Sequence, residues 1–242
     1  MKTNTIFKIL ILLARPAAGK SEIIHYLRGL NDEERISKFH IGKLHIIDDF
    51  PMLWNWFEED NLLKEMGKPQ IYTDENGYFN KKYLWDLLIK KINLEYKKFI
   101  RDTPDHDQYT VILEFSRGKE HGGYKRALAY LSSEILAKSA ILYLEVSWQE
   151  SLRKNRARFN PNFPDSILEH SLPDEKLKNL YFECDFRDMS DGNSGQIHIN
   201  NLNIPYVILD NENDLTSKQG KVLADQLNKK LSKLLKFFTG AN

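Results

Sequence analysis

Three adjacent residues near the start of the chain, Gly19, Lys20 and Ser21, have the types and order of a phosphate-binding site. An apolar run rich in β-forming residues, from Ile6 to Leu13, precedes them and is long enough for one buried strand. A helical pattern of apolar residues follows from Ile23 onward. A strand, a tight loop, Gly-Lys-Ser and a helix are the elements of the P-loop, also called the Walker A motif.

A loop of this kind attracts an anion because of its backbone chemistry. The first N–H groups of the helix have no intrahelical acceptor and their dipoles add, so the site favours a nucleotide phosphate. Glycine lets the backbone approach the phosphates, the ammonium of Lys20 would reach the outer phosphates, and the hydroxyl of Ser21 would ligate Mg²⁺. The residues expected to bind the cofactor are Arg15, Pro16, Ala17, Ala18, Gly19, Lys20, Ser21 and Glu22.

One position departs from this motif, which begins with glycine where the chain has Ala14. Alanine fits a left-handed backbone conformation poorly, so the loop would be strained if that position required a positive φ. The competing interpretation is an ordinary strand-to-helix turn in which the Gly-Lys-Ser sequence is incidental.

Two acidic residues, Asp48 and Asp49, directly follow the second expected strand. A carboxylate there, facing a phosphate donor, could take a proton from an attacking hydroxyl or hold the polar end of a substrate. The competing interpretation is a helix start, with Asp49 near the N-cap ahead of Pro51. We expect one of the two acids to cap the helix and the other to face the site.

A further acid, Glu114, lies near the end of an apolar strand and is followed by Arg117. A carboxylate beside a phosphate loop can bind Mg²⁺ directly or through water, and the arginine could orient an anion or a substrate. The competing interpretation is a surface ion pair of Glu114 with Arg117 or Lys119. A carboxylate in a hydrophobic strand is costly without a partner, which favours the functional interpretation.

An arginine-rich segment follows the fourth expected strand. On a helix Arg153 and Arg156 share a face, with Arg158 nearby, and several guanidinium groups can clamp a transferring phosphoryl group. The alternatives are a solvated basic face and an RNA-binding patch. After the last strand, the segment 210–214 could contact a base, although capping of the final helix by Asp214 is the favoured interpretation.

The apolar patterns predict alternating strands and helices. Strands are expected over residues 6–13, 39–47, 110–115, 140–146 and 204–209. Helices are expected from residue 23, over 51–67, 80–101, 124–137, 148–158, 165–171, 174–188 and 215–238, with a loop at 191–195. Five hydrophobic strands separated by helices indicate an α/β fold with a parallel sheet covered on both faces, whose ligand lies at the carboxyl ends of the strands.

Composition narrows the classes of protein. The chain has 242 residues, 41% of them hydrophobic, and a net charge of +1, which gives no electrostatic case for nucleic acid or an anionic membrane. A single cysteine, Cys184, favours a reducing cytoplasm. The N-terminal apolar run is interrupted by Lys8 and is too short to span a bilayer, so a core strand is the better interpretation. The histidines show no paired metal-ligand spacing.

Taken together, these residues resemble the P-loop nucleoside and nucleotide kinases. Gly19, Lys20 and Ser21 match the phosphate loop of that family, and Asp48 or Asp49 lies where its deoxynucleoside kinases have a catalytic carboxylate. The Glu114–Arg117 segment is similar to a Glu-Arg-Ser motif but has two residues inserted between acid and arginine. The resemblance implies a three-layer, doubly wound, five-stranded parallel sheet of order 2-3-1-4-5 with a helical lid, and ATP with Mg²⁺ as the donor.

The resemblance further implies one domain over residues 1–242, a helical substrate-binding insertion at 50–101 and a lid at 148–190. The expected catalytic residues are Lys20, Asp48, Asp49, Arg117, Arg153, Arg156 and Arg158, and the expected metal ligands are Ser21 and Glu114. The aromatic residues that could stack on a flat ring are Trp54, Trp56, Tyr72, Tyr78 and Tyr83, for most of which core packing is favoured.

The expected function is that of a cytoplasmic ATP-dependent kinase acting on a small-molecule phosphate acceptor, such as a nucleoside, a nucleotide or a similar compound. The alternative is a non-catalytic ATP-binding regulatory or switch module. The sequence lacks the Asn-Lys-x-Asp segment with which GTPases recognise their base. No nucleic-acid or membrane partner is expected, and a homodimer is left open.

Overall fold

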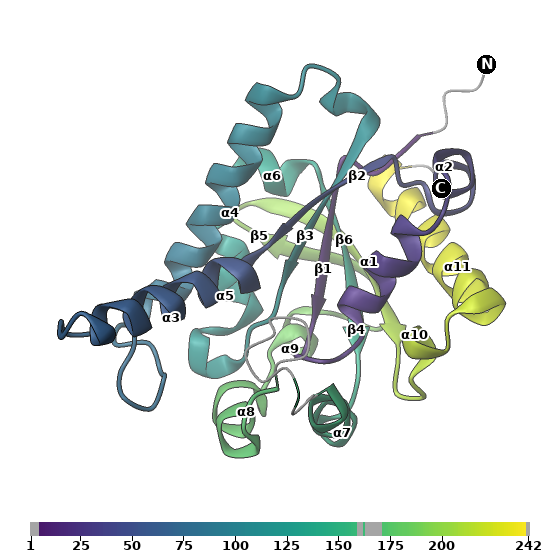
Figure 1. Ribbon diagram of the computed structural model, residues 1–242. Helices are drawn as coiled ribbons and strands as arrows, with labels where there is room; N and C mark the ends of the chain where they lie inside the picture. Colours follow the sequence, from purple (N-terminus) through teal and green to yellow (C-terminus); the bar gives the residue numbers. More distant parts are fainter. Residues whose placement is uncertain (1–4, 159–161, 163–170, 241–242) are drawn as a thin grey trace.

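A six-stranded sheet forms the centre of the computed structural model, which describes residues 5–158, 162 and 171–240 (Figure 1). Its strand order is β2-β3-β1-β4-β6-β5, and every neighbouring pair is parallel except the antiparallel β5–β6 pair. The strands are β1 (Ile9–Ala14), β2 (Lys43–Asp48), β3 (Tyr109–Phe115), β4 (Ser139–Glu145), β5 (Ser194–Ile199) and β6 (Leu202–Asp210).

The expectation of a five-stranded sheet of order 2-3-1-4-5 is therefore wrong in its number of strands, because the sheet has a sixth strand; without it, the remaining strands stand in the order β2-β3-β1-β4-β6. The strand that it omits is β5, which lies at the edge of the sheet and pairs only with β6. Only Ile197 and Ile199 of β5 are buried, so its residues lack the continuous apolar run that marks the interior strands. Part of the expected loop at 191–195 is the beginning of this strand.

Helices cover both faces of the sheet, as the α/β pattern predicts. Along β1, alternate residues point to opposite faces: Ile11 packs with residues of α4, α5 and α6, and Leu12 packs with residues of α1 and α11. The helices are α1 (Lys20–Arg28), α2 (Asp32–Phe39), α3 (Asp49–Glu65), α4 (Tyr83–Asp102), α5 (Gly123–Ala129), α6 (Ser133–Ala137), α7 (Trp148–Arg158), α8 (Asp174–Tyr181), α9 (Phe186–Met189), α10 (Leu215–Lys218) and α11 (Gly220–Thr239).

Several expected element boundaries are corrected by local capping. Phe39 is the last residue of α2 and does not open a strand. This helix begins at Asp32, because the side chain of Asn31 accepts a hydrogen bond from the Glu34 amide and caps it. The expected helix over 124–137 divides into α5 and α6, since Ser132 caps the second of them. The expected helix over 215–238 divides at Gln219 and Gly220, both of which have positive φ.

The other helix boundaries also differ from expectation. The expected helix over 174–188 is interrupted between α8 and α9, and most of the expected helix over 165–171 lies outside the described residues.

The helix α3 extends outward from the sheet, and it contacts α4, which packs against the sheet (Figure 1). The segment that joins them is held against α3 by Asp60, whose buried carboxylate accepts hydrogen bonds from the amides of Ile71, Tyr72 and Thr73. These contacts satisfy three backbone amides that would otherwise lack partners. Among the described residues, no helix is long and apolar enough to cross a membrane.

Candidate functional site

A cavity of about 520 Å³ lies at the carboxyl ends of β1, β2 and β3. The loop after β1, the start of α3, the segment after β3 and the helix α7 all contribute to its lining. This is the edge of the sheet at which parallel α/β proteins bind ligands. The polar residues of its lining include Lys20, Ser21, Asp48, Asp49, Glu114, Ser116, Arg117, Arg153, Lys154 and Arg158.

The loop between β1 and α1 has the backbone of an anion site. Gly19 is the N-cap of α1, with φ of 106°, and has no side chain to cap the helix. The first backbone hydrogen bond of α1 runs from the Ile23 amide to the Gly19 carbonyl, so the amides of residues 20–22 have no acceptor within the helix. Because these amides carry the positive end of the helix dipole, the position favours phosphate oxygens.

The departure at Ala14 does not strain the loop. Ala14 is the last residue of β1, paired in register with Leu144, and is not among the positions with positive φ. The left-handed positions are Ala17, with φ of 57°, and Gly19. The chain therefore has alanine in place of the motif's first glycine, at a position that needs only the extended backbone of a strand.

Gly19 also has a steric reason to lack a side chain. A Cβ at this position would lie 2.2 Å from Thr216 Oγ1 and 2.7 Å from Asn211 Nδ2, both from the segment that follows β6. The side-chain amide of Asn211 donates a hydrogen bond to the Ala18 carbonyl over 2.8 Å, which connects the two loops. The sequence analysis considered Asn211 only within the segment 210–214, as a possible contact to a base, and did not select Thr216, because their contacts with the loop after β1 join distant parts of the chain.

Lys20 points toward the end of β3. Its Nζ donates a hydrogen bond to Ser116 Oγ over 2.7 Å and lies 3.9 Å from Glu114 Oε1. Lys20 and Glu114 are both buried, so their charges attract each other with little screening by water. Sequence reasoning missed Ser116, although it is two residues after the expected metal ligand.

The carboxylates of Asp48 and Glu114 come together through strand pairing. These two residues are opposite each other in the β2–β3 register. Burial, the neighbouring charge of Glu114 and that of Asp49 raise the pKa of Asp48 to about 7. Burial also raises the pKa of Glu114, against the opposing effect of Lys20. The competing interpretation of Glu114 as a surface residue is wrong, because its side chain is buried at the cavity.

Asp48 caps α3, since its Oδ1 accepts a hydrogen bond from the Phe50 amide over 2.9 Å. The expectation that one acid caps the helix while the other faces the site describes the structure incompletely, because both acids line the cavity. Asp49 instead forms an ion pair with Arg117, whose Nη1 lies 2.6 Å from Asp49 Oδ2. Burial raises the pKa of Asp49, and the guanidinium of Arg117 opposes that rise.

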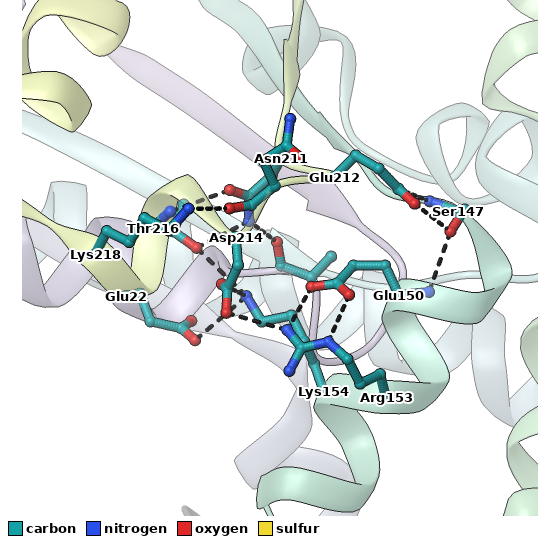
Figure 2. A network of polar contacts seen from close by, with 12 residues as sticks. Glu22, Ser147, Glu150, Arg153, Lys154, Asn211, Glu212, Asp214, Thr216 and Lys218 are labelled. Atoms are coloured by element: carbon teal, nitrogen blue, oxygen red, sulfur yellow. Dashed lines mark hydrogen bonds and ion pairs between the residues drawn. The ribbon is translucent and has the colours of Figure 1, made fainter.

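Two cationic residues of α7 meet Asp214 at the other side of the cavity (Figure 2). Lys154 Nζ donates to Asp214 Oδ1 over 2.7 Å, and Arg153 contacts both Asp214 and Glu150. Burial acts to raise the pKa of Asp214, but the hydrogen bond from Lys154 and its charge outweigh burial and lower the pKa to about 2. Asp214 stands at the N-cap of α10 without a side-chain cap, so the capping interpretation is wrong.

Lys154 is a cavity residue that sequence reasoning did not select. Its Nζ also lies 3.9 Å from Glu22 Oε1, which connects α7 to the first turn of α1. The available signal was its place within the arginine-rich segment, where it is one helical turn before Arg158.

Two expected site residues point elsewhere. Arg15 donates to the carbonyls of Tyr181 and Phe182 at the end of α8. Arg156 forms an ion pair with Asp174 and its side chain is 63% exposed. Neither is among the described residues that line the cavity. The side on which each arginine lies depends on the rotation of its segment, which the spacing of charges does not determine.

The aromatic residues chosen for ring stacking also lie outside the described cavity lining. Trp56 stacks on Tyr72 with their ring centroids 5.1 Å apart, inside a small apolar cluster between α3 and α4. Tyr83 is 61% exposed. Core packing is thus the correct interpretation of Trp56 and Tyr72, and the aromatic residues that do line the cavity are Phe50, Trp85, Phe115 and Tyr181.

The oxygen donors at the cavity suit Mg²⁺ in kind. The hydroxyl of Ser21 and the carboxylate of Glu114 both line it, and Mg²⁺ is bound through one or two protein oxygens together with phosphate oxygens and water. Within the part of the chain that the structure describes, no group of three or more His, Cys, Asp and Glu residues could hold a metal ion by itself. An ion at this site would therefore share its coordination shell with a ligand.

Comparison with known proteins does not assign the chain to a family. No protein-family model matches it, and no curated protein matches it. An unliganded sugar kinase from Janibacter sp. HTCC2649 is similar at 12% sequence identity and a TM-score of 0.42, over 96% of this chain and 95% of that one.

Two further solved structures are similar to the same degree. APE1195 is similar at 13% identity and a TM-score of 0.42, over 98% of this chain and 97% of its own. TT1252 from Thermus thermophilus is similar at 14% identity and a TM-score of 0.37, over 99% and 100%.

Proposed function

We propose that this protein is an ATP-dependent phosphotransferase that transfers the γ-phosphoryl group to a small-molecule acceptor. The observation that supports the proposal is the meeting, in one cavity, of an uncapped helix N-terminus, the buried ammonium of Lys20 and the carboxylates of Asp48 and Glu114. An anion site beside buried acids is the arrangement that binding a phosphate donor and activating an acceptor both require.

In this proposal the donor's phosphate oxygens accept hydrogen bonds from the amides of residues 20–22 and from the ammonium of Lys20. Ser21 and Glu114 would hold Mg²⁺, which supplies positive charge to the phosphate oxygens when it is bound. Lys20 would exchange its hydrogen bond with Ser116 for one with a phosphate oxygen. Arg158, which also lines the cavity, is proposed to offset charge on the transferred group.

Asp48 is the proposed general base. The acceptor hydroxyl oxygen forms a bond to the γ-phosphorus, the bond between that phosphorus and the β–γ bridging oxygen breaks, and the hydroxyl proton passes to the Asp48 carboxylate. With a pKa of about 7, this carboxyl group can take the proton and return it to solvent near neutral pH. We further propose that residues 50–101 form the acceptor-binding insertion and residues 148–190 the lid.

The test of the proposal is acceptor-dependent ADP release. Purified protein is incubated with ATP and Mg²⁺ and a panel of nucleosides, nucleotides, sugars and amino-alcohols, and we expect at least one acceptor to raise the rate of ADP formation. Lys20→Ala should lower that rate by about a hundredfold or more, because removal of one charged donor from a transition state costs roughly 3 kcal/mol.

The matched control is Lys38→Ala, which removes a lysine that is exposed and pairs with Glu34 far from the cavity. It should leave the rate unchanged. A protein that ATP stabilises against heat, but that releases no ADP with any acceptor, would instead be a nucleotide-binding module.

A further inference from the structure

Charge is unevenly distributed around the cavity. On the side next to α7, the charged lining groups are the cations of Arg153, Lys154 and Arg158 and the carboxylates of Glu22 and Asp214, so cations outnumber acids there by one. On the side formed by the ends of β2 and β3, the charged lining groups are Asp48, Asp49, Glu114 and Arg117. Lys20 reaches between the two sides. A donor phosphate therefore has cations on its own side, and the acceptor side carries an excess of acid.

Among the described lining residues of the acceptor side, the arginine is Arg117, and its guanidinium already has partners. Arg117 is 2% exposed, forms its ion pair with Asp49, and donates hydrogen bonds to the carbonyls of Ser116 and Trp85. Its guanidinium carbon lies 5.1 Å from the centroid of the Trp85 ring. A second anion could bind Arg117 only by displacing Asp49, which would leave a buried carboxylate without its partner.

The neighbouring acids also resist a further negative charge. Asp48 and Glu114 are opposite each other across two strands, and Asp49 lines the same cavity. The charges of Lys20 and Arg158 both act on Glu114, and in the proposed function the donor engages both cations. A phosphate or carboxylate on the acceptor would be repelled by these acids, with little screening by water. This repulsion would lower the affinity for a charged acceptor relative to an uncharged one.

The remaining wall on this side is apolar or aromatic. Phe50 and Leu53 come from α3, Trp85 from α4 and Tyr181 from α8. Such a wall buries the body of a ring compound while a few polar groups fix its hydroxyl.

We propose that the acceptor is an uncharged hydroxyl compound with a flat or apolar body, and that the site discriminates against the phosphate ester of the same compound. This inference rests on the proposed phosphotransferase function and narrows it. The proton-accepting carboxylate of Asp48 would lie against the hydroxyl, and the ion pair with Asp49 occupies Arg117, the described arginine that a phosphate on the acceptor would otherwise contact.

The experiment compares matched acceptors that differ only in a phosphate ester. Adenosine, thymidine and glucose are each assayed against their monophosphates by ADP release with ATP and Mg²⁺. We expect the uncharged member of any accepted pair to have a kcat/KM at least tenfold higher than its ester.

The possible results separate this inference from the function on which it rests. An ester used as fast as its uncharged partner, or faster, would overturn the inference and leave the phosphotransferase function standing. If neither member of any pair, nor any compound of the wider acceptor panel, supported ADP release, the function itself would be overturned, and the inference with it.

A variant tests whether charge is the cause of the selectivity. Leu53→Lys places an ammonium on the apolar wall of the acceptor side, where a long side chain can reach into the cavity. We expect it to reduce the preference for the uncharged acceptor by tenfold or more. Leu53→Met has a similar length and no charge and should keep the preference. An unchanged preference in a folded Leu53→Lys protein would overturn the electrostatic explanation.

Discussion

At the scale of the residue, Asp48 performs two tasks that conflict. Its carboxylate caps α3 through the Phe50 amide, and it stands opposite Glu114 across two strands. Capping favours the charged form, whereas burial and the nearby acids disfavour it more strongly and raise the pKa to about 7. A carboxylate whose charged form is destabilised in this way is typical of functional sites and lowers the free energy of unfolding.

The raised pKa predicts how Asp48→Asn changes stability. The native Asp48 carboxyl keeps its proton up to about pH 7, whereas the carboxyl in the unfolded chain loses its proton near the ordinary pKa of 3.8. Because the native state binds more protons between these two pH values, the free energy of unfolding of the natural protein falls as pH rises through that window. Asparagine does not titrate and can still cap the helix.

We expect the free energy of unfolding of Asp48→Asn, relative to that of the natural protein, to rise by about 1–3 kcal/mol between about pH 5 and about pH 8. Urea unfolding at both values, without nucleotide or Mg²⁺, measures it. An advantage that stays constant across this range would contradict the raised pKa.

Gly19 gives a second prediction at this scale. Gly19→Ala places a Cβ against Thr216 and Asn211 and in a left-handed conformation, so we expect it to lower the free energy of unfolding by roughly 2–4 kcal/mol. Gly192→Ala is the matched control, because Gly192 has φ of 68° and no atom within 4 Å of an added Cβ. The control should cost only about 1 kcal/mol. Equal losses in urea unfolding would show that the contact with the segment after β6 is unimportant.

At the scale of the element, the contact of α7 with the segment after β6 pairs the cationic side chains of the cavity with a carboxylate. Lys154 is buried and its ammonium is held by Asp214, with Glu22 somewhat farther away (Figure 2). Asn211 from the same segment holds the Ala18 carbonyl. The segment thus touches both the proposed phosphate loop and the helix whose charges would face the phosphates.

Removal of the Asp214 charge should couple stability to nucleotide. Asp214→Asn leaves Lys154 without its nearest counter-ion, so we expect a loss of about 1–3 kcal/mol in the absence of ligand. ATP phosphates would supply the missing negative charge, and the increase in Tm on addition of ATP with Mg²⁺ should be larger in the variant than in the natural protein.

Differential scanning fluorimetry with and without ATP measures both effects of Asp214→Asn. Asp174→Asn serves as the control, because Asp174 pairs with the exposed Arg156 away from the cavity. It should leave the shift in Tm unchanged. A shift in Asp214→Asn no larger than that of the natural protein would argue against a meeting of Lys154 with the phosphates.

At the scale of the whole molecule, the parallel sheet brings distant residues to one place. Lys20, Asp48 and Glu114 follow or end three strands that are neighbours in the order β2-β3-β1. Because parallel strands have their carboxyl ends on one edge, the position of these residues after apolar runs was enough to predict that they meet. The arginines of α7 are harder to place, since a helix carries side chains in all directions around its axis.

The sequence by itself determined the α/β class, the interior strands and the convergence of Lys20, Asp48, Asp49 and Glu114, because buried parallel strands are recognisable as apolar runs and their ends share an edge. Only the tertiary structure decided the remainder. The edge strand β5 lacks an apolar run, Arg15 and Arg156 turn toward α8 and Asp174, and Asn211, Thr216 and Lys154 act through contacts between segments far apart in the chain. Local patterns record which residues are buried, whereas the partners of a polar side chain depend on packing that no local pattern contains.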